Sequence, residues 1–155
     1  RLSAALDADP EGIHARSWDG WTPLHLAAFF GHVDAISLLL DRGADAEARS
    51  GNYMSNTSLC AAIAGAGDPA SFDVLVRRGA RVDARAALGV TPLHLAASRG
   101  RDSFVRTLLQ NGADAHATMD DGTTPASMAR AHTPQSSARI PSYPCTSAET
   151  TAPRT

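Results

Sequence analysis

The chain has 155 residues, which is enough for one domain. Hydrophobic residues make up 43% of it and aromatic residues only 5%, so the core has to be built from Ala, Leu, Val and Ile. The net charge of −2, from 14 basic and 16 acidic residues, gives no overall attraction to nucleic acid, and no apolar run is long enough to span a membrane.

Residues 1–16 begin within a helical unit. The i, i+3, i+4 spacing of Leu2, Ala5 and Leu6 is typical of the second helix of a helix pair. Ala15-Arg16 then matches the pairs that precede later turns, Ala48-Arg49 and Ala84-Arg85. We expect a partial amino-terminal cap here, either a short cap or a unit that lacks its first half.

The next segment, Asp19-Gly20-Trp21-Thr22-Pro23-Leu24-His25, predicts a turn followed at once by a helix. Thr22 can cap the helix with its hydroxyl, and Pro23 suits the first helical position because its missing N–H costs nothing there. His25 stands where a side chain can bond back to the cap. We therefore predict a helix over 23–30 that stops at Gly31, followed by a second helix with a one-sided apolar stripe.

The same phrase returns along the chain. It recurs as Thr91-Pro92-Leu93-His94, and degraded copies stand at Thr57-Ser58-Leu59-Cys60 and Thr124-Pro125-Ala126-Ser127. The four threonines are separated by 35, 34 and 33 residues. The second unit departs most, because its turn is two residues longer, it lacks the Pro and His, and it has an extra residue within 64–69.

The fourth unit has one predicted helix, from Thr124 to about His132, and no second one. Pro134 follows, and residues 133–155 are rich in Ser, Thr and Pro without any period. This composition predicts a disordered tail or linker.

A period near 33 residues with a Thr-Pro-Leu-His core resembles the ankyrin repeat. The resemblance covers roughly residues 2–132. It implies an all-α fold, a helix-turn-helix solenoid of about three and a half repeats joined by hairpin-like turns. The domain would span 1–132, with a partial cap at 1–16, repeats at 17–49, 50–85 and 86–118, and a truncated unit at 119–132.

The resemblance also implies a binding surface, because in this family the turn positions and the end of the inner helix face a concave groove and vary with the partner. Position by position, the partner-binding candidates are Trp18, Asp19, Trp21, Phe29 and Phe30 in repeat one, Tyr53, Met54 and Asn56 in repeat two, and Leu88, Val90, Ser98 and Arg99 in repeat three. Four aromatic residues in one repeat suggest an apolar binding patch. The alternative is that they cover the incomplete amino-terminal unit as core.

Catalytic, cofactor and metal sites are not expected. His25 and His94 lie 69 residues apart without other ligands at metal spacing, so we interpret both as structural. No phosphate loop or nucleophile motif is present, and we do not expect Cys60 and Cys145 to pair. The cluster of Arg77, Arg78, Arg81 and Arg85 is either a solvated surface or a match for an anionic patch on a partner.

The sequence therefore predicts a non-catalytic module that binds a protein or peptide in its groove. The alternative is a passive or regulatory segment of a longer protein whose activity lies in another domain. We expect no cofactor, no nucleic-acid or membrane partner, a monomeric chain and a cytoplasmic location.

Overall fold

The structure is a computed structural model that describes residues 8–65 and 68–132. Within this part of the chain there are seven α-helices, two short 3-10 helices and no strand. In chain order the elements are η1 (Pro10–His14), α2 (Pro23–Phe30), α3 (Val33–Asp41), α4 (Ser58–Ala64), α5 (Pro69–Arg77), η2 (Ala87–Gly89), α6 (Pro92–Ser98), α7 (Asp102–Gln110) and α8 (Pro125–His132). The all-α prediction is confirmed.

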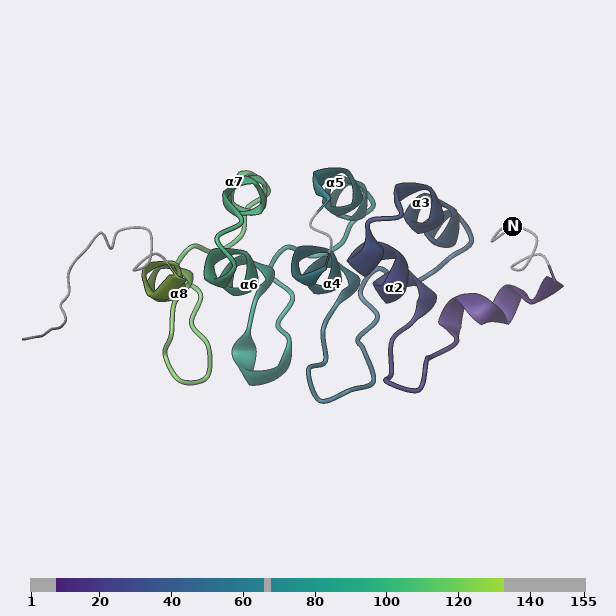
Figure 1. Cartoon of the computed structure of the whole chain (residues 1–155), viewed down its shortest axis with the longest axis horizontal. Helices are drawn as coiled ribbons and strands as arrows, with labels where there is room; N and C mark the ends of the chain where they lie inside the picture. The colour runs from purple at the N-terminus through teal and green to yellow at the C-terminus, as the bar shows by residue number, and fades with distance from the viewer. Residues whose placement is uncertain (1–7, 66–67, 133–155) are drawn as a thin grey trace, which may run out of the picture.

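The helices form two rows, and the turns form a third layer (Figure 1). An inner row holds α2, α4, α6 and α8, an outer row holds α3, α5 and α7, and the hairpins project from the opposite side of the inner row. Each inner helix packs on the next inner helix, and α2, α4 and α6 also pack on their own outer helix. This is the solenoid that the repeat pattern predicts.

The core runs the length of the stack and is made chiefly of aliphatic side chains. Its largest fully buried members include Leu24, Ile36, Leu39, Leu59, Ile63, Leu75 and Leu108. In the outer row, the rings of Phe72 on α5 and Phe104 on α7 stack with their centroids 4.9 Å apart. The rings therefore join the second and third repeats.

The inner helices of repeats one and three, α2 and α6, start as the motif predicts. Thr22 and Thr91 form capping boxes with His25 and His94, and both helices have Pro at the first position. In repeat two, Thr57 still accepts a bond from the Cys60 backbone N–H, but Cys60 takes the place of the histidine ring. The helix of repeat one ends at Gly31, which has the positive φ of 74° expected at a helix stop.

Three arginines at equivalent positions link neighbouring units. Arg16 donates to the carbonyl of Arg49 at 2.7 Å, Arg49 donates to the carbonyl of Arg85, and Arg85 donates to the carbonyl of Thr118 at 2.9 Å. The sequence showed that these arginines recur, but not that each one bonds to the following unit.

The extra segment of repeat two makes a close contact that the sequence did not reveal. Gly65 follows α4 rather than lying within it, and a Cβ atom at this position would meet the carbonyl oxygen of Phe29 at 1.9 Å. Residue 65 therefore has to be Gly for α2 and α4 to approach this closely.

Some predictions fall on residues outside the described ranges. They include the helical spacing of Leu2, Ala5 and Leu6 and the tail or linker at 133–155. Before the first turn the structure shows the short η1, whose Ile13 is buried against the stack. The repeat boundaries stay predictions.

Candidate partner-binding surface

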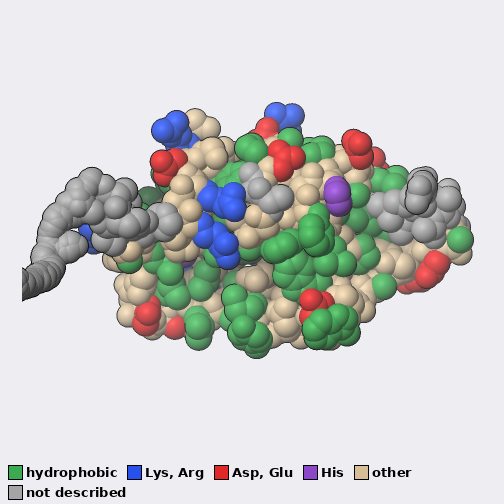
Figure 2. Space-filling model, viewed as in Figure 1, with side chains coloured by type: hydrophobic (Ala, Val, Ile, Leu, Met, Phe, Trp, Pro, Cys, Tyr) green, Lys and Arg blue, Asp and Glu red, His purple; other side chains and the backbone are tan. Residues whose placement is uncertain are grey.

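None of the twelve predicted partner-binding residues is buried. Six are exposed, namely Trp18, Phe30, Tyr53, Met54, Leu88 and Arg99. The other six are half-buried, namely Asp19, Trp21, Phe29, Asn56, Val90 and Ser98. Figure 2 shows hydrophobic side chains gathered over the face that carries the end of α2 and along the hairpin edge.

Ring contacts join three of the four aromatic residues of repeat one. The Trp21 ring meets Phe29 edge-on at 5.3 Å between centroids, and Phe29 meets Phe30 in the same way at 5.3 Å. Trp21 and Phe29 also pack against the core, whereas Phe30 remains 59% exposed. We call Trp21, Phe29 and Phe30 the aromatic row; it extends from the first hairpin to the end of α2.

Trp18 is placed differently from the aromatic row. It lies at the tip of the first hairpin with 98% of its surface exposed, and no ring contact among the described residues joins it to the row. Beside it, the Asp19 carboxylate accepts a hydrogen bond from the Ser17 hydroxyl. The core alternative therefore applies in part to Trp21 and Phe29, and not to Trp18.

The second and third hairpins carry further exposed apolar side chains. Tyr53 is 87% exposed and Leu88 is 70% exposed. Leu88 has a positive φ of 61°, a conformation that costs a residue with a branched side chain about 1–2 kcal/mol. At the carboxyl end of α6, the Ser98 hydroxyl donates to the Leu95 carbonyl, and Arg99, which follows the helix, is exposed.

The two motif histidines bond within the protein. The Nε2 atom of His25 lies 2.9 Å from the carbonyl oxygen of Asn56, and that of His94 lies 3.0 Å from the carbonyl oxygen of Thr123. Because a carbonyl only accepts, Nε2 carries the proton and Nδ1 accepts from the cap threonine. Each histidine thus joins its own helix start to the following hairpin, a link between units that the sequence did not reveal.

The protonation of His25 follows from this arrangement. Burial lowers the pKa of His25 below its usual 6.5, an effect that the hydrogen bond to Asn56 opposes. A second proton would have to go on Nδ1, which is already an acceptor for Thr22. The neutral ring is therefore a structural link and is unavailable as a metal ligand.

The predicted arginine cluster is largely used in intramolecular contacts. Arg77 pairs with Asp73 at 2.9 Å on the same helix, and Arg78 pairs with Asp41 of the preceding repeat at 2.8 Å. Arg85 bonds to backbone carbonyls as described above. These contacts favour the solvated-surface interpretation over an anion-binding one.

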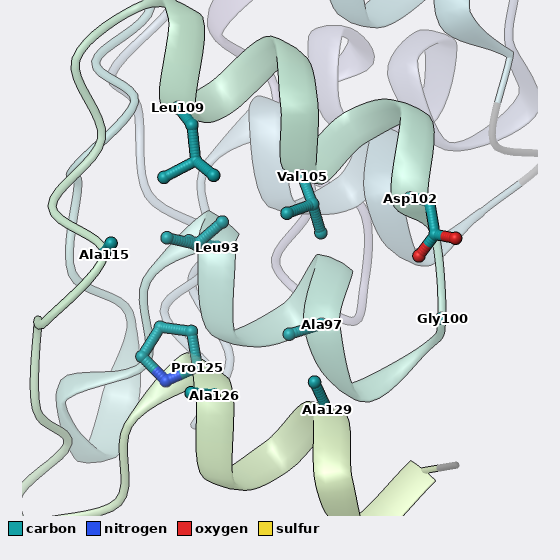
Figure 3. Close-up of a pocket in the computed structure, with 10 residues that line it drawn as sticks. All are labelled: Leu93, Ala97, Gly100, Asp102, Val105, Leu109, Ala115, Pro125, Ala126 and Ala129. Atoms are coloured by element: carbon teal, nitrogen blue, oxygen red, sulfur yellow. The ribbon is translucent and has the colours of Figure 1, made fainter. Parts of the chain in front are cut away.

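An apolar groove of about 260 Å³ lies where α6, α7 and α8 meet (Figure 3). Its lining includes Leu93 from α6, Val105 and Leu109 from α7, and Pro125 and Ala129 from α8. Asp102 is the one charged residue of the lining and stands at one end. The groove therefore lacks the paired acid, base or nucleophile that catalysis needs.

The remaining reactive side chains include Cys60 and the possible metal ligands. Burial raises the pKa of the Cys60 thiol, so this cysteine stays protonated and poorly nucleophilic. Among residues 8–65 and 68–132, no three His, Cys, Asp or Glu side chains are grouped to hold a metal ion. No described helix has the length and apolar character needed to cross a bilayer.

Comparison with known proteins agrees with this architecture. The family model "Ankyrin repeat" matches residues 19–51, and "Ankyrin repeats (many copies)" matches residues 75–129. The chain belongs to the ankyrin repeat family. Ankyrin repeats are generally protein–protein interaction modules, and the family is generally non-enzymatic.

Two relatives are much longer than this chain. B-cell lymphoma 3 protein homolog of Mus musculus is 34% identical over an alignment of 140 positions, and the alignment covers 83% of this chain and 29% of that protein. Neurogenic locus notch homolog protein 2 of Homo sapiens is 41% identical over 104 residues, which are 66% of this chain and 4% of that protein. The chain thus spans less than a third of the length of either relative.

The twelve predicted partner-binding residues do not include the fourth hairpin. Asp120 and Asp121 stand there at the positions equivalent to Trp18 and Asp19, and both are exposed. The sequence already indicates this equivalence, because Asp120 and Asp121 precede Thr124 by the same numbers of residues as Trp18 and Asp19 precede Thr22.

Proposed function

We propose that this chain is a non-catalytic module that binds a protein partner on the hairpin side of its inner helices, with the aromatic row at the centre. The observation that carries the proposal is the row itself. Trp21 and Phe29 pack against the core and contact each other edge-on, and Phe29 in turn contacts the exposed Phe30 edge-on. A rigid aromatic side chain that is ordered before binding loses little entropy when a partner covers it.

The available area is adequate for a specific interface. A large aromatic side chain can bury about 150–250 Å², so the exposed Trp18 and Phe30, with the part of Trp21 and Phe29 that the core leaves uncovered, supply a substantial share of the roughly 800 Å² that one partner contributes to an ordinary interface. Tyr53 and Met54 of the second hairpin extend this apolar surface as its edge. Trp and Tyr are also the residues that most often dominate binding energy.

Photo-cross-linking tests the location of this surface. A photoreactive phenylalanine analogue placed at Phe30 should yield a protein adduct in a lysate of the source cells, because a bound partner would cover this side chain. The matched control is the same analogue at Gln110, which is exposed on α7 of the outer row. Adducts of equal yield from both positions, or adducts from Gln110 alone, would rule out the proposed surface.

The second candidate function is a passive or regulatory repeat segment within a longer protein. The size of the two relatives favours it, because the matched region is a minor part of each. If the chain is such a segment, the photoreactive analogue at Phe30 should give no adduct with another protein, even when the complete gene product is used.

A further inference from the structure

We infer that the apolar groove between α6, α7 and α8 is a docking site for an amphipathic α-helix of a partner protein, which packs there as a fourth outer helix. The ligand helix has two large apolar side chains four residues apart on the side that faces the groove. The inference rests on the preceding junctions between repeats, where the chain's own outer helices fill the equivalent place. It goes beyond the proposed function, because the groove lies at the opposite end of the stack from the aromatic row.

The outer row ends one helix before the inner row. Among residues 8–65 and 68–132, α2, α4 and α6 each pack on an outer helix of their own, while α8 has none (Figure 1). The groove opens at this place, and Figure 3 shows side chains of α7 and α8 on its two sides. A helical solenoid normally ends in a unit with a polar outer face. This end is apolar instead, so it resembles a junction between repeats rather than a cap.

Two positions on each outer helix face the following repeat. They stand seven and three residues before the glycine that follows the helix, and they hold Ile36 and Leu40, Phe72 and Val76, and Val105 and Leu109. In the first two repeats, Ile36 and Phe72 are fully buried because the next outer helix covers them, as the stacking of Phe72 on Phe104 of α7 shows. In repeat three, Val105 is only half-buried and Leu109 is 44% exposed. The surface that the earlier repeats cover is therefore open here.

The fourth inner helix leaves extra space in the groove. The second residue of the inner helix is Leu24, Leu59 or Leu93 in the first three units, and all three leucines are buried. The fourth unit has Ala126 at this position, and Ala126 is exposed. Figure 3 shows side chains extending from α7 toward the α8 side of the groove, where Ala126 stands. An alanine in place of a leucine leaves room for a large side chain from a docked helix.

The helix α7 shows what kind of ligand fills such a place. Its buried side chains, Phe104 and Leu108, stand four residues apart. Its other faces are exposed, for example at Arg106 and Gln110. A helix that lies in a groove is recognised through this one-sided apolar pattern. Residues 133–155 contain four prolines and no helical apolar period, so they do not supply the pattern, and we assign the ligand helix to a partner.

The charge in the groove favours one direction of the ligand helix. Asp102 is the one charged residue of the lining and stands at the end where α7 begins. A helix docked parallel to α7 places its N-terminus, which carries a partial positive charge, beside this carboxylate. The reverse direction would place a partial negative charge there. We therefore expect the parallel arrangement, which is also that of equivalent helices in a repeat stack.

The test uses a helical peptide and the full chain. The probe copies residues 101–111, because α7 fills the equivalent place against α5. In the probe, Arg106→Lys and Gln110→Glu are joined by a side-chain lactam, which holds this short helix without covering its apolar face. Calorimetry should show saturable binding of one probe per chain. A matched peptide with Phe104→Ser and Leu108→Ser should bind about tenfold more weakly or worse, because it lacks both apolar side chains.

Protein variants locate the bound probe. Ala126→Leu restores the leucine of the other units and fills the groove, so it should weaken binding about tenfold without lowering the melting temperature. Leu109→Asn should weaken binding by a similar factor of about ten, because it removes an apolar side chain from the lining. Leu26→Asn is the matched control and should leave the affinity unchanged, since Leu26 is 38% exposed on α2 and lies outside the groove. The methyl resonances of Val105 should shift when the probe binds, and those of Leu26 should not.

The inference is wrong if the probe does not saturate, if the matched serine peptide binds equally well, or if Ala126→Leu and Leu109→Asn both leave the affinity unchanged. A photoreactive phenylalanine analogue at Leu109 of the full chain distinguishes the other occupants. An adduct with residues 133–155 of the same chain would assign the groove to the chain's own continuation, and an adduct between two copies would assign it to a second copy. Either adduct overturns the inference. The analogue at Phe30 tests the proposed function separately, so the failure of one proposal leaves the other standing.

Discussion

The first and third repeats have nearly the same framework and very different surfaces. Both start their inner helix with Thr-Pro-Leu-His-Leu-Ala-Ala, and both motif histidines are fully buried and bond to the carbonyl of the following hairpin. After this shared run, repeat one continues with Phe29-Phe30 and repeat three with Ser98-Arg99. The run that is identical in both repeats therefore maintains the fold, whereas the residues that follow it differ in chemistry between the repeats and are the ones we propose for recognition.

Removing a motif histidine should have the largest effect on stability. The effect should be similar in repeats one and three. His25→Ala and His94→Ala should each lower the free energy of unfolding by about 2–4 kcal/mol, because the cap threonine and a carbonyl lose their partner and a cavity remains. Cys60→Ala, at the equivalent position of repeat two, should cost only about 1 kcal/mol, because among the described residues no hydrogen bond joins Cys60 to the next hairpin. Urea unfolding measures all three, and equal losses in the three variants would contradict the role given to the histidines.

A substitution at the close contact between α2 and α4 should have the second largest effect on stability. Gly65→Ala should cost about 1–3 kcal/mol, because its Cβ would meet the Phe29 carbonyl oxygen at 1.9 Å and the helices would have to separate. Gly43→Ala is the matched control, since its Cβ would meet nothing within 4 Å and only its positive φ opposes the change. Thermal unfolding compares the two, and a Gly65→Ala loss no larger than that of the control would show that the contact adjusts freely.

The stability should depend on pH through His25. Its pKa is lowered in the folded chain, so below about pH 6.5 the unfolded chain binds a proton that the folded chain resists. The contribution of His25 is therefore present above pH 6.5 and declines as the pH falls below it, by at most about 1.4 kcal/mol per pH unit. Urea unfolding at pH 7.5, 6.5 and 5.5 should give a shallower decline for His25→Ala than for the parent, and identical slopes would contradict this.

The sequence predicts the local features of this fold well and the contacts between repeats poorly. The Thr-Pro-Leu-His run specifies a helix start through bonds among four consecutive residues, so the starts of α2 and α6 follow from the sequence. The bonds of Arg16 to Arg49 and of His25 to Asn56 join residues more than thirty positions apart. They depend on how one unit stacks on the next, and the repeat pattern reports only that such residues recur.

The same distinction applies to the predicted surface. Matching positions between repeats selected twelve residues that all keep some exposure. It could not separate Phe30 from Trp21, because the degree of burial depends on the neighbouring core rather than on position in the motif. The same matching of positions could have included Asp120, since the fourth hairpin stands at the same distance from its cap threonine.

The most direct test of the central claim is Phe30→Arg, which gives repeat one the residue that repeat three carries at the equivalent position. Because Phe30 is 59% exposed, the free energy of unfolding should change by less than about 1 kcal/mol. The Phe30 cross-link identifies the protein that wild type captures. The folded Phe30→Arg variant should no longer capture this protein, whereas Gln110→Arg should still capture it. A folded Phe30→Arg variant that captures this protein as well as wild type does would contradict the account.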